Sequence, residues 1–175
     1  MITAIDSLTR LDMLDYYTSG STVASRNAFG GDVSVKLLTD ESISIGTTIS
    51  SDVTISVLPA GRDTMFLVVN TLALPTPDSY AVVYKKDWTK GQKKLQPVNH
   101  NDLTLWVTPQ ARARMSEIEN LVPFVPAIYT YSDGVLTITN TLGRLLSADD
   151  YNAVKPYLKP AISYRWNGKK WSMVK

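Results

Sequence analysis

The stretch from Met65 to Leu74, Met-Phe-Leu-Val-Val-Asn-Thr-Leu-Ala-Leu, is the longest nearly unbroken apolar run in the chain. Pro75 and Pro77 close it. A run of this length that contains β-branched and aromatic residues and ends at proline is typical of a buried strand rather than of a helix. A central strand needs a hydrogen-bonded neighbour on each side, so we expect strands before and after it.

The segments on both sides alternate between apolar and polar residues. The period of two is clear in residues 33–37, 43–45 and 53–57, and residues 59–63 contain the proline and glycine of a turn into the Met65 strand. Alternation predicts strands with one face in water, which favours antiparallel pairing. Further strands are expected at residues 80–84, 103–107, 128–131 and 135–140.

Capping signals predict short helices. Thr108 and Pro109 would start a helix as N-cap and first helical residue, with an apolar stripe that runs to Val122. Ser147 would cap another helix, whose first turn holds the adjacent carboxylates of residues 149–150.

One turn signal predicts a hairpin in the second half of the chain. Asp133-Gly134 is typical of a two-residue turn and would place Tyr131 opposite Leu136.

A second hairpin is expected at the end of the chain. The Asn-Gly pair at residues 167–168 fits a type I′ turn, which would pair Tyr164 with Trp171 and Arg165 with Lys170. The like-charge pair would suit water or an acidic neighbour. The aromatic residues on the other face would form a platform for a sugar or an apolar face packed on the sheet or on a partner.

Taken together, these elements predict a mainly β protein of the β-rich α+β class. At 175 residues and 19.4 kDa, we expect one domain. Residues 1–31 would be an N-terminal helix or arm and a linker, and residues 32–175 a single β-rich domain. Its body would be an antiparallel sandwich or a jelly roll with two or three short helices.

The N-terminal segment has an apolar stripe of its own. Ile5, Leu8, Leu11 and Leu14 recur every three residues, with aspartates between them. This pattern predicts a short helix over residues 4–17 or an arm that lies on a neighbour.

Charge is unevenly distributed along the chain. Residues 1–80 hold four Lys and Arg against nine Asp and Glu, whereas residues 81–175 hold fourteen against seven. This asymmetry favours head-to-tail contact between copies or attraction to an anion, unless the two halves neutralise each other within one fold.

A cluster of lysines is the strongest polar feature. Trp88 follows Tyr84 and has lysines on both sides of it. Cations interleaved with aromatic residues can hold phosphates and stack bases. This cluster leaves several interpretations open: a solvated loop, a contact between subunits, a site for nucleic acid, or a site for another anion. Its lysines are Lys85, Lys86, Lys90, Lys93 and Lys94.

Groups for catalysis are scarce, and we predict that the protein is not an enzyme. His100 is the only histidine, there is no cysteine, and no Gly-x-Ser-x-Gly, Walker A or His-Glu-x-x-His motif occurs. We interpret His100 as an ordinary loop residue and the carboxylates of residues 149–150 as helix-capping groups. We therefore expect no cofactor, no metal site and no membrane partner.

The last hairpin also carries a family resemblance. Its sequence Tyr-Arg-Trp-Asn-Gly-Lys-Lys-Trp, residues 164–171, resembles short aromatic Asn-Gly hairpins that close many bacteriophage tail, fibre and head-decoration chains. Those families are also cysteine-free, Ser/Thr-rich β proteins with an N-terminal attachment arm. The resemblance implies a structural component of a virus particle, a capsid, head-decoration, fibre or tail protein, located in the virion after assembly in the host cytoplasm.

We therefore expect a non-enzymatic protein that assembles with copies of itself and with other virion proteins through surface contacts. The alternatives are a nucleic-acid-binding module that uses residues 85–94 and a carbohydrate- or receptor-binding β domain. The residues expected to make contacts are Ile5, Leu8, Leu11, Leu14, Lys85, Lys86, Trp88, Lys90, Lys93, Lys94, Arg165, Trp166, Lys170 and Trp171.

Overall fold

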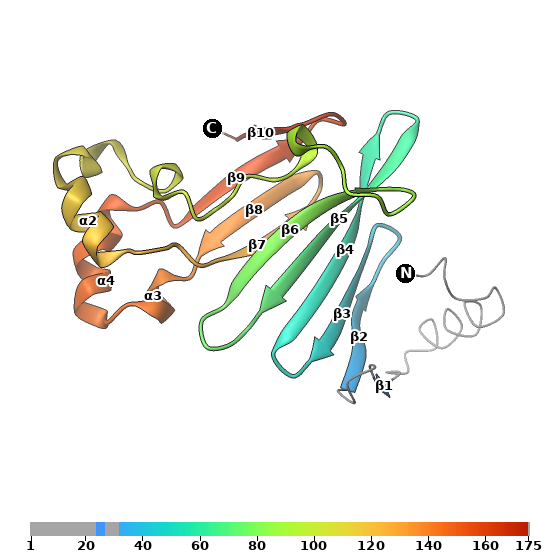
Figure 1. Ribbon diagram of the computed structural model, residues 1–175, viewed down its shortest axis with the longest axis horizontal. Helices are drawn as coiled ribbons and strands as arrows, with labels where there is room; N and C mark the ends of the chain where they lie inside the picture. The colour runs from blue at the N-terminus through green and yellow to red at the C-terminus, as the bar shows by residue number, and fades with distance from the viewer. Residues whose placement is uncertain (1–23, 27–31, 175) are drawn as a thin grey trace.

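The computed structural model describes residues 24–26 and 32–174, which form two antiparallel sheets (Figure 1). The expected mainly β antiparallel fold is confirmed. Strands follow one another in chain order within each sheet, so each sheet is a meander. Of the two forms expected for the body, a sandwich and a jelly roll, this topology is that of the sandwich. The larger sheet contains β1 (Ala24–Arg26), β2 (Asp32–Leu38), β3 (Ser42–Thr48), β4 (Ser51–Ala60), β5 (Asp63–Leu72) and β6 (Asp78–Lys85). The smaller sheet contains β7 (Ala127–Ser132), β8 (Val135–Asn140), β9 (Ala161–Trp166) and β10 (Trp171–Met173).

The apolar run that begins at Met65 forms β5, which pairs with β4 on one side and β6 on the other. The expected strand with two neighbours is confirmed, but only alternate side chains are fully buried. Leu67 and Val69 are 0% and 3% exposed, whereas Phe66 and Val68, which alternate with them, point to the opposite face and are partly exposed. The run is therefore buried on one face.

Helical segments occur in the connection between the two sheets and in the β8–β9 connection within the smaller sheet. Between β6 and β7 lie the 3₁₀ helices η2 (Lys93–Leu95), η3 (Leu103–Leu105) and η4 (Pro109–Arg114), followed by α2 (Met115–Leu121). Between β8 and β9 lie α3 (Leu142–Leu145), α4 (Ala148–Val154) and η5 (Lys155–Tyr157). Helices α2, α3 and α4 gather at one end of the molecule (Figure 1). No helix among the described residues is long and apolar enough to cross a membrane.

The strand expected at residues 103–107 is wrong, because this segment begins with η3. The Asp102 side chain accepts hydrogen bonds from the Thr104 amide at 3.0 Å and from its hydroxyl at 2.6 Å. Such local bonds compete with strand pairing. Trp106 is then fully buried, and its indole donates to the His100 carbonyl at 2.7 Å.

Of the two helix caps predicted from the sequence, the structure shows the one at Ser147 but not the one at Thr108. The Ser147 side chain accepts from the Asp150 amide at 3.1 Å and caps α4, as expected. The helix expected from Thr108 is present in two pieces, η4 and then α2, and the Thr108 side chain makes no capping bond.

The two hairpins also differ in outcome. In β7 and β8, Tyr131 lies opposite Leu136 as expected. In β9 and β10, Trp171 lies opposite Trp166 rather than Tyr164, because the Asn167 side chain accepts from the amides of residues 169 and 170 and closes a four-residue loop. The expected pairing of Arg165 with Lys170 is therefore wrong, since Ser172 lies opposite Arg165.

The hydrophobic core is formed by the smaller sheet, the helical connections and only one part of the larger sheet. The larger sheet contributes Leu58, Leu67, Val69 and Val83 to it, all from β4 to β6. Among the described residues, no side chain of β2 or β3 belongs to this core. One side of the larger sheet therefore extends beyond the smaller sheet. β1, which lies within the segment expected to be a linker, pairs with β2 at the far edge.

Candidate functional site: a cationic end beside an open cleft

Three chain segments meet at one end of the molecule. They are the lysine loop (residues 85–96), the β4–β5 turn (residues 60–63) and the β9–β10 turn (residues 167–170). The Trp171 indole donates to the Leu95 carbonyl at 3.0 Å, and the Lys86 ammonium lies 3.9 Å from an Asp63 carboxylate oxygen. A Cβ on Gly168 would lie 3.7 Å from the Pro59 carbonyl oxygen, so the third turn touches β4 directly.

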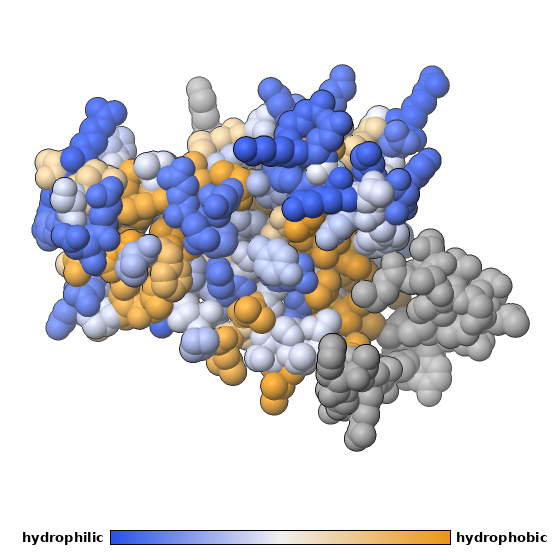
Figure 2. Space-filling view, viewed as in Figure 1, coloured by the Kyte–Doolittle hydropathy of each residue, from blue (hydrophilic) through white to orange (hydrophobic). Residues whose placement is uncertain are grey.

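These three segments carry a dense positive charge, which appears as hydrophilic side chains at the top of the molecule in Figure 2. Eight cations and two carboxylates lie in them, and all eight cations are exposed. The Asp63–Lys86 pair is exposed, with 71% and 75% of the side chains accessible, so it neutralises little of the field. We name this surface the cationic end: Arg62, Lys85, Lys86, Lys90, Lys93, Lys94, Lys169 and Lys170.

The second carboxylate, Asp87, serves the fold of the lysine loop. It accepts from the Thr89 amide at 3.0 Å and from the Thr89 hydroxyl at 2.7 Å. The hydroxyl bond and then the amide bond hold the pKa of Asp87 below its usual value. This carboxylate is thus engaged in a turn that positions the neighbouring lysines.

Trp88 anchors the lysine loop. Its backbone φ is 62°, and its ring stacks on Phe66 with centroids 4.9 Å apart and planes 11° apart. The Tyr84 ring lies 6.1 Å away and tilted by 51°. Because Phe66 takes one face of the indole, Trp88 holds the loop on the sheet and offers at most its other face to a partner.

Gln96, which no sequence pattern predicted as a functional residue, also holds this loop. Its amide oxygen accepts from the Val83 N–H at 2.9 Å, and its amide nitrogen donates to the carbonyls of Val83 at 3.1 Å and Gly91 at 2.8 Å. The side chain thus occupies the hydrogen-bonding groups at the edge of β6. These bonds fix the backbone of the loop from which the lysine side chains project.

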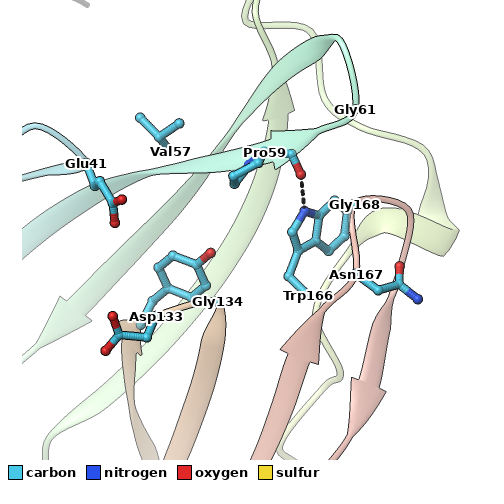
Figure 3. Close-up of a pocket in the computed structure, with 10 residues that line it drawn as sticks. Glu41, Val57, Pro59, Gly61, Asp133, Gly134, Trp166, Asn167 and Gly168 are labelled. Carbon is cyan, nitrogen blue, oxygen red and sulfur yellow. Dashed lines mark hydrogen bonds between the residues drawn. The ribbon is translucent and has the colours of Figure 1, made fainter.

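An open cleft of about 590 Å³ lies beside the cationic end, between the ends of the two sheets (Figure 3). Trp166 forms one wall, and its indole donates to the Pro59 carbonyl at 2.7 Å. Tyr131 and two carboxylates, Glu41 and Asp133, line the rest of the cleft. Burial raises the pKa of Tyr131, and the charge of Glu41 adds to this. The cleft is thus acidic where the neighbouring surface is cationic.

Of the two alternatives for the aromatic residues of the last hairpin, a sugar platform and an apolar face packed on the sheet, the structure shows packing for Trp166 and Trp171. Trp166 is only 7% exposed, and the Trp171 ring packs on it with centroids 5.1 Å apart. Both indole N–H groups donate to backbone carbonyls within the protein. The prediction that Trp166 offers a surface contact is therefore wrong, because the ring is buried between the sheets. Arg165 and Lys170 are exposed as expected.

His100 is buried rather than an ordinary loop residue, since it is 5% exposed. Its Nδ1 lies 2.9 Å from the Tyr129 hydroxyl, which donates to the Val98 carbonyl at 3.0 Å. Its Nε2 lies 3.0 Å from an Asp78 carboxylate oxygen but outside hydrogen-bonding geometry. Burial lowers the pKa of His100, and the charge of Asp78 opposes this. The histidine thus links β6 and β7.

Other candidates for chemistry serve the fold. The Asp150 carboxylate accepts from the Ser147 hydroxyl at 2.7 Å in the helix cap. In the part of the chain that the structure describes, no three His, Asp or Glu side chains form a group that could hold a metal ion. The apolar stripe of residues 5, 8, 11 and 14 lies outside the described residues.

The chain belongs to the family described as "Protein of unknown function (DUF3256)", whose model matches residues 1–171. A solved structure with a similar fold is a domain of an uncharacterized protein from Porphyromonas gingivalis W83. It is 21% identical, with a TM-score of 0.74 over 97% of this chain and 89% of that chain, and at this identity the likeness concerns the fold alone. No curated protein sequence matches the chain.

Proposed function

We propose that this protein is a non-enzymatic binding module that contacts an acidic surface of another protein through its cationic end. The observation that carries the proposal is the convergence of three turns whose eight cations are all exposed. Contacts between these turns hold their backbones, and thus the attachment points of the cations, near one another before a partner arrives. Pre-organised charges lose less freedom on binding and steer a complementary partner to the surface.

Two features favour a protein partner over nucleic acid. Trp88 uses one face on Phe66, which leaves a single indole face for a base in this loop. Glu41 and Asp133 line the adjacent cleft and would repel a continuous phosphate backbone. A protein surface can offer acidic side chains to the cations and a basic side chain to the cleft.

The partner can be another copy of the chain, because residues 1–80 carry an excess of carboxylates. Contact between that half of one copy and the cationic end of the next would produce head-to-tail assembly. Assignment to a bacteriophage particle is a finer prediction that rests on the aromatic hairpin at residues 164–171.

Charge reversal on two of the three turns tests the proposal. Lys93→Glu with Lys94→Glu, and Lys169→Glu with Lys170→Glu, change exposed side chains outside the core. Binding of polyglutamate, measured by calorimetry, should weaken at least tenfold in either variant, and wild-type affinity should fall as salt is raised. Light scattering on the same samples reports whether self-association falls in parallel.

The matched control is Arg112→Glu with Arg144→Glu, which makes the same charge change in exposed residues of the helical end. Equal loss of binding in the control would show that net charge alone acts and would contradict the proposal. Single-stranded DNA is the second probe. Tighter binding of DNA than of polyglutamate at equal charge, lost in the lysine variants, would instead support the nucleic-acid module.

A further inference from the structure

The larger sheet has an apolar face directed away from the smaller sheet. Strand alternation places Leu67 and Ser56, which are buried, on the inner side, so their neighbours lie on the other side. A row of paired residues crosses four strands there: Ile43 opposite Ile55, Ile55 opposite Val68, and Val68 opposite Val82. A second row pairs Ile45 with Val53. We name this surface the outer face: Ile43, Ile45, Val53, Ile55, Val68 and Val82.

These side chains have no counterpart in the described core. All six are partly exposed, and none is among the core residues or the apolar residues packed against them. Figure 2 shows hydrophobic surface over β4, below the hydrophilic top of the molecule. A contiguous apolar area of this kind marks a surface that another segment or molecule covers.

The inner side of the same strands is more polar than the outer face, which favours burial of the outer face. At β3 and β4 the inner side carries hydroxyl groups, and the Thr54 hydroxyl donates to the Ser44 hydroxyl at 3.1 Å. Lys36 and Asp52 form an ion pair nearby. Because Ser44, Thr54, Lys36 and Asp52 occupy the inner side of this part of the sheet, the apolar residues on the opposite side are the ones suited to being covered.

We propose that residues 1–17 of the same chain cover the outer face, through the apolar stripe Ile5, Leu8, Leu11 and Leu14. This segment supplies the matching chemistry, since its apolar residues recur every three positions with aspartates between them. It also precedes β1, which is the edge strand of the sheet that bears the outer face. At one edge of the same side of the sheet, another segment of the chain already covers an apolar residue: Trp88 of the lysine loop stacks on Phe66.

The dimensions fit. A helix over residues 4–17 would be roughly 21 Å long, at 1.5 Å per residue. The seven residues of β3 span about 23 Å, so one such helix covers the strand from end to end. Residues 18–23 reach up to about 20 Å when extended. The distance from β1 to β3 or β4 is about 10–14 Å, at two or three strand spacings.

Connection within one chain favours this occupant over a second copy. A short linker that spans the distance gives the tethered segment an effective concentration in the millimolar range. A free partner must exceed that concentration or bind more tightly.

Cross-linking tests the inference, because the chain contains no cysteine. Leu8 or Leu11 is replaced by Cys, together with Ile55→Cys or Val68→Cys, which places the second thiol on the outer face. At least one of the four pairings should form a disulfide within one chain under mild oxidation, because a disulfide needs Cα atoms about 4–7 Å apart. The matched control is Thr54→Cys with the same partners, which puts the thiol on the inner side and should form none.

The products separate the possible occupants. A disulfide only between two chains would overturn the inference in favour of an arm exchanged with a second copy. No disulfide in any of the four pairings, or equal yield with Thr54→Cys, would overturn it in favour of a different partner. None of these residues belongs to the cationic end, so this result and the charge-reversal result are independent.

Amphipathic substitution supplies a second measurement. Leu8→Asp with Leu11→Asp should raise the fluorescence of bound anilinonaphthalene sulfonate several-fold and speed amide exchange in β3 and β4, while β8 and β9 keep their protection. Thr9→Asp with Met13→Asp adds the same charge outside the apolar stripe and should leave both signals unchanged. Unchanged dye binding in the first variant would contradict the inference.

Discussion

The inner and outer sides of the larger sheet differ in polarity, and the difference changes from the strands at its centre to those nearer its edge. At β5, Leu67 and Val69 face inward and are buried by the smaller sheet. At the paired segments of β3 and β4, the inward side chains include Ser44 and Thr54, and the apolar residues Ile43, Ile45, Val53 and Ile55 face outward. The difference shows that the side of a strand that carries the apolar residues changes across one sheet, because only part of the inner side is packed against the smaller sheet.

The largest expected effect compares neighbouring residues of β5. Leu67→Ala removes a fully buried side chain and should lower the free energy of unfolding by about 2–5 kcal/mol. Val68→Ala removes a partly exposed side chain of the outer face and should cost about 1 kcal/mol. Urea unfolding of both variants measures the difference. Equal costs would show that both sides of β5 are buried alike.

The same pair sharpens the inference about residues 1–17. In a chain that lacks these residues, the cost of Val68→Ala should fall toward zero, because the outer face then stays in water. The cost of Leu67→Ala should not change. A Val68→Ala cost that is the same in both chains would count against a cover supplied by residues 1–17.

An intermediate effect concerns the link between the two sheets. Burial lowers the pKa of His100 below its usual 6.5, so the unfolded chain binds a proton more readily than the folded one. The neutral histidine therefore contributes stability above its usual pKa that is lost as the pH falls below it. The free energy of unfolding should decrease between about pH 7 and about pH 5.

The control for this pH dependence is His100→Asn, which has no titrating ring. Its unfolding curve should be flatter over the same interval, although its stability is lower because a buried contact with Tyr129 changes. Chemical denaturation at several pH values measures both curves. Identical slopes in the two proteins would mean that His100 does not couple folding to protonation.

The smallest expected effect tests the polar inner side. Thr54→Val removes the hydrogen bond to Ser44 but leaves the shape of the side chain similar. Because this part of the inner side is not covered by the smaller sheet, the free energy of unfolding should change by less than about 1 kcal/mol. A loss several times larger, seen in thermal unfolding, would show that the inner side of β4 is buried.

Local patterns predicted much of the fold. The run from Met65, the alternating segments before it and the strand expected at residues 80–84 identified β2 to β6 but not β1, and Asp133-Gly134 set the register of β7 and β8. These signals depend on side-chain alternation and turn geometry, which act over a few residues. The register predicted for the last hairpin was wrong, because the Asn167 side chain accepts hydrogen bonds from two backbone amides and the loop is longer than the expected two residues.

The candidate site was predicted only in part. The lysine cluster was visible as a run of residue types, and five of its lysines belong to the cationic end. Arg62 and Lys169 were missed, since they lie on turns distant in sequence that meet the lysine loop only in the folded chain. Gln96 was missed because its role is to complete the hydrogen bonds of β6.

By itself, the sequence determined the positions of most strands, the mainly β class and the contrast between two sides of each strand, because these follow from local alternation. The tertiary structure alone decided which side of each strand meets the second sheet, and that Trp166 and His100 are buried between segments far apart in the chain. The physical reason is that alternation separates two faces, but only long-range packing determines which of them is covered.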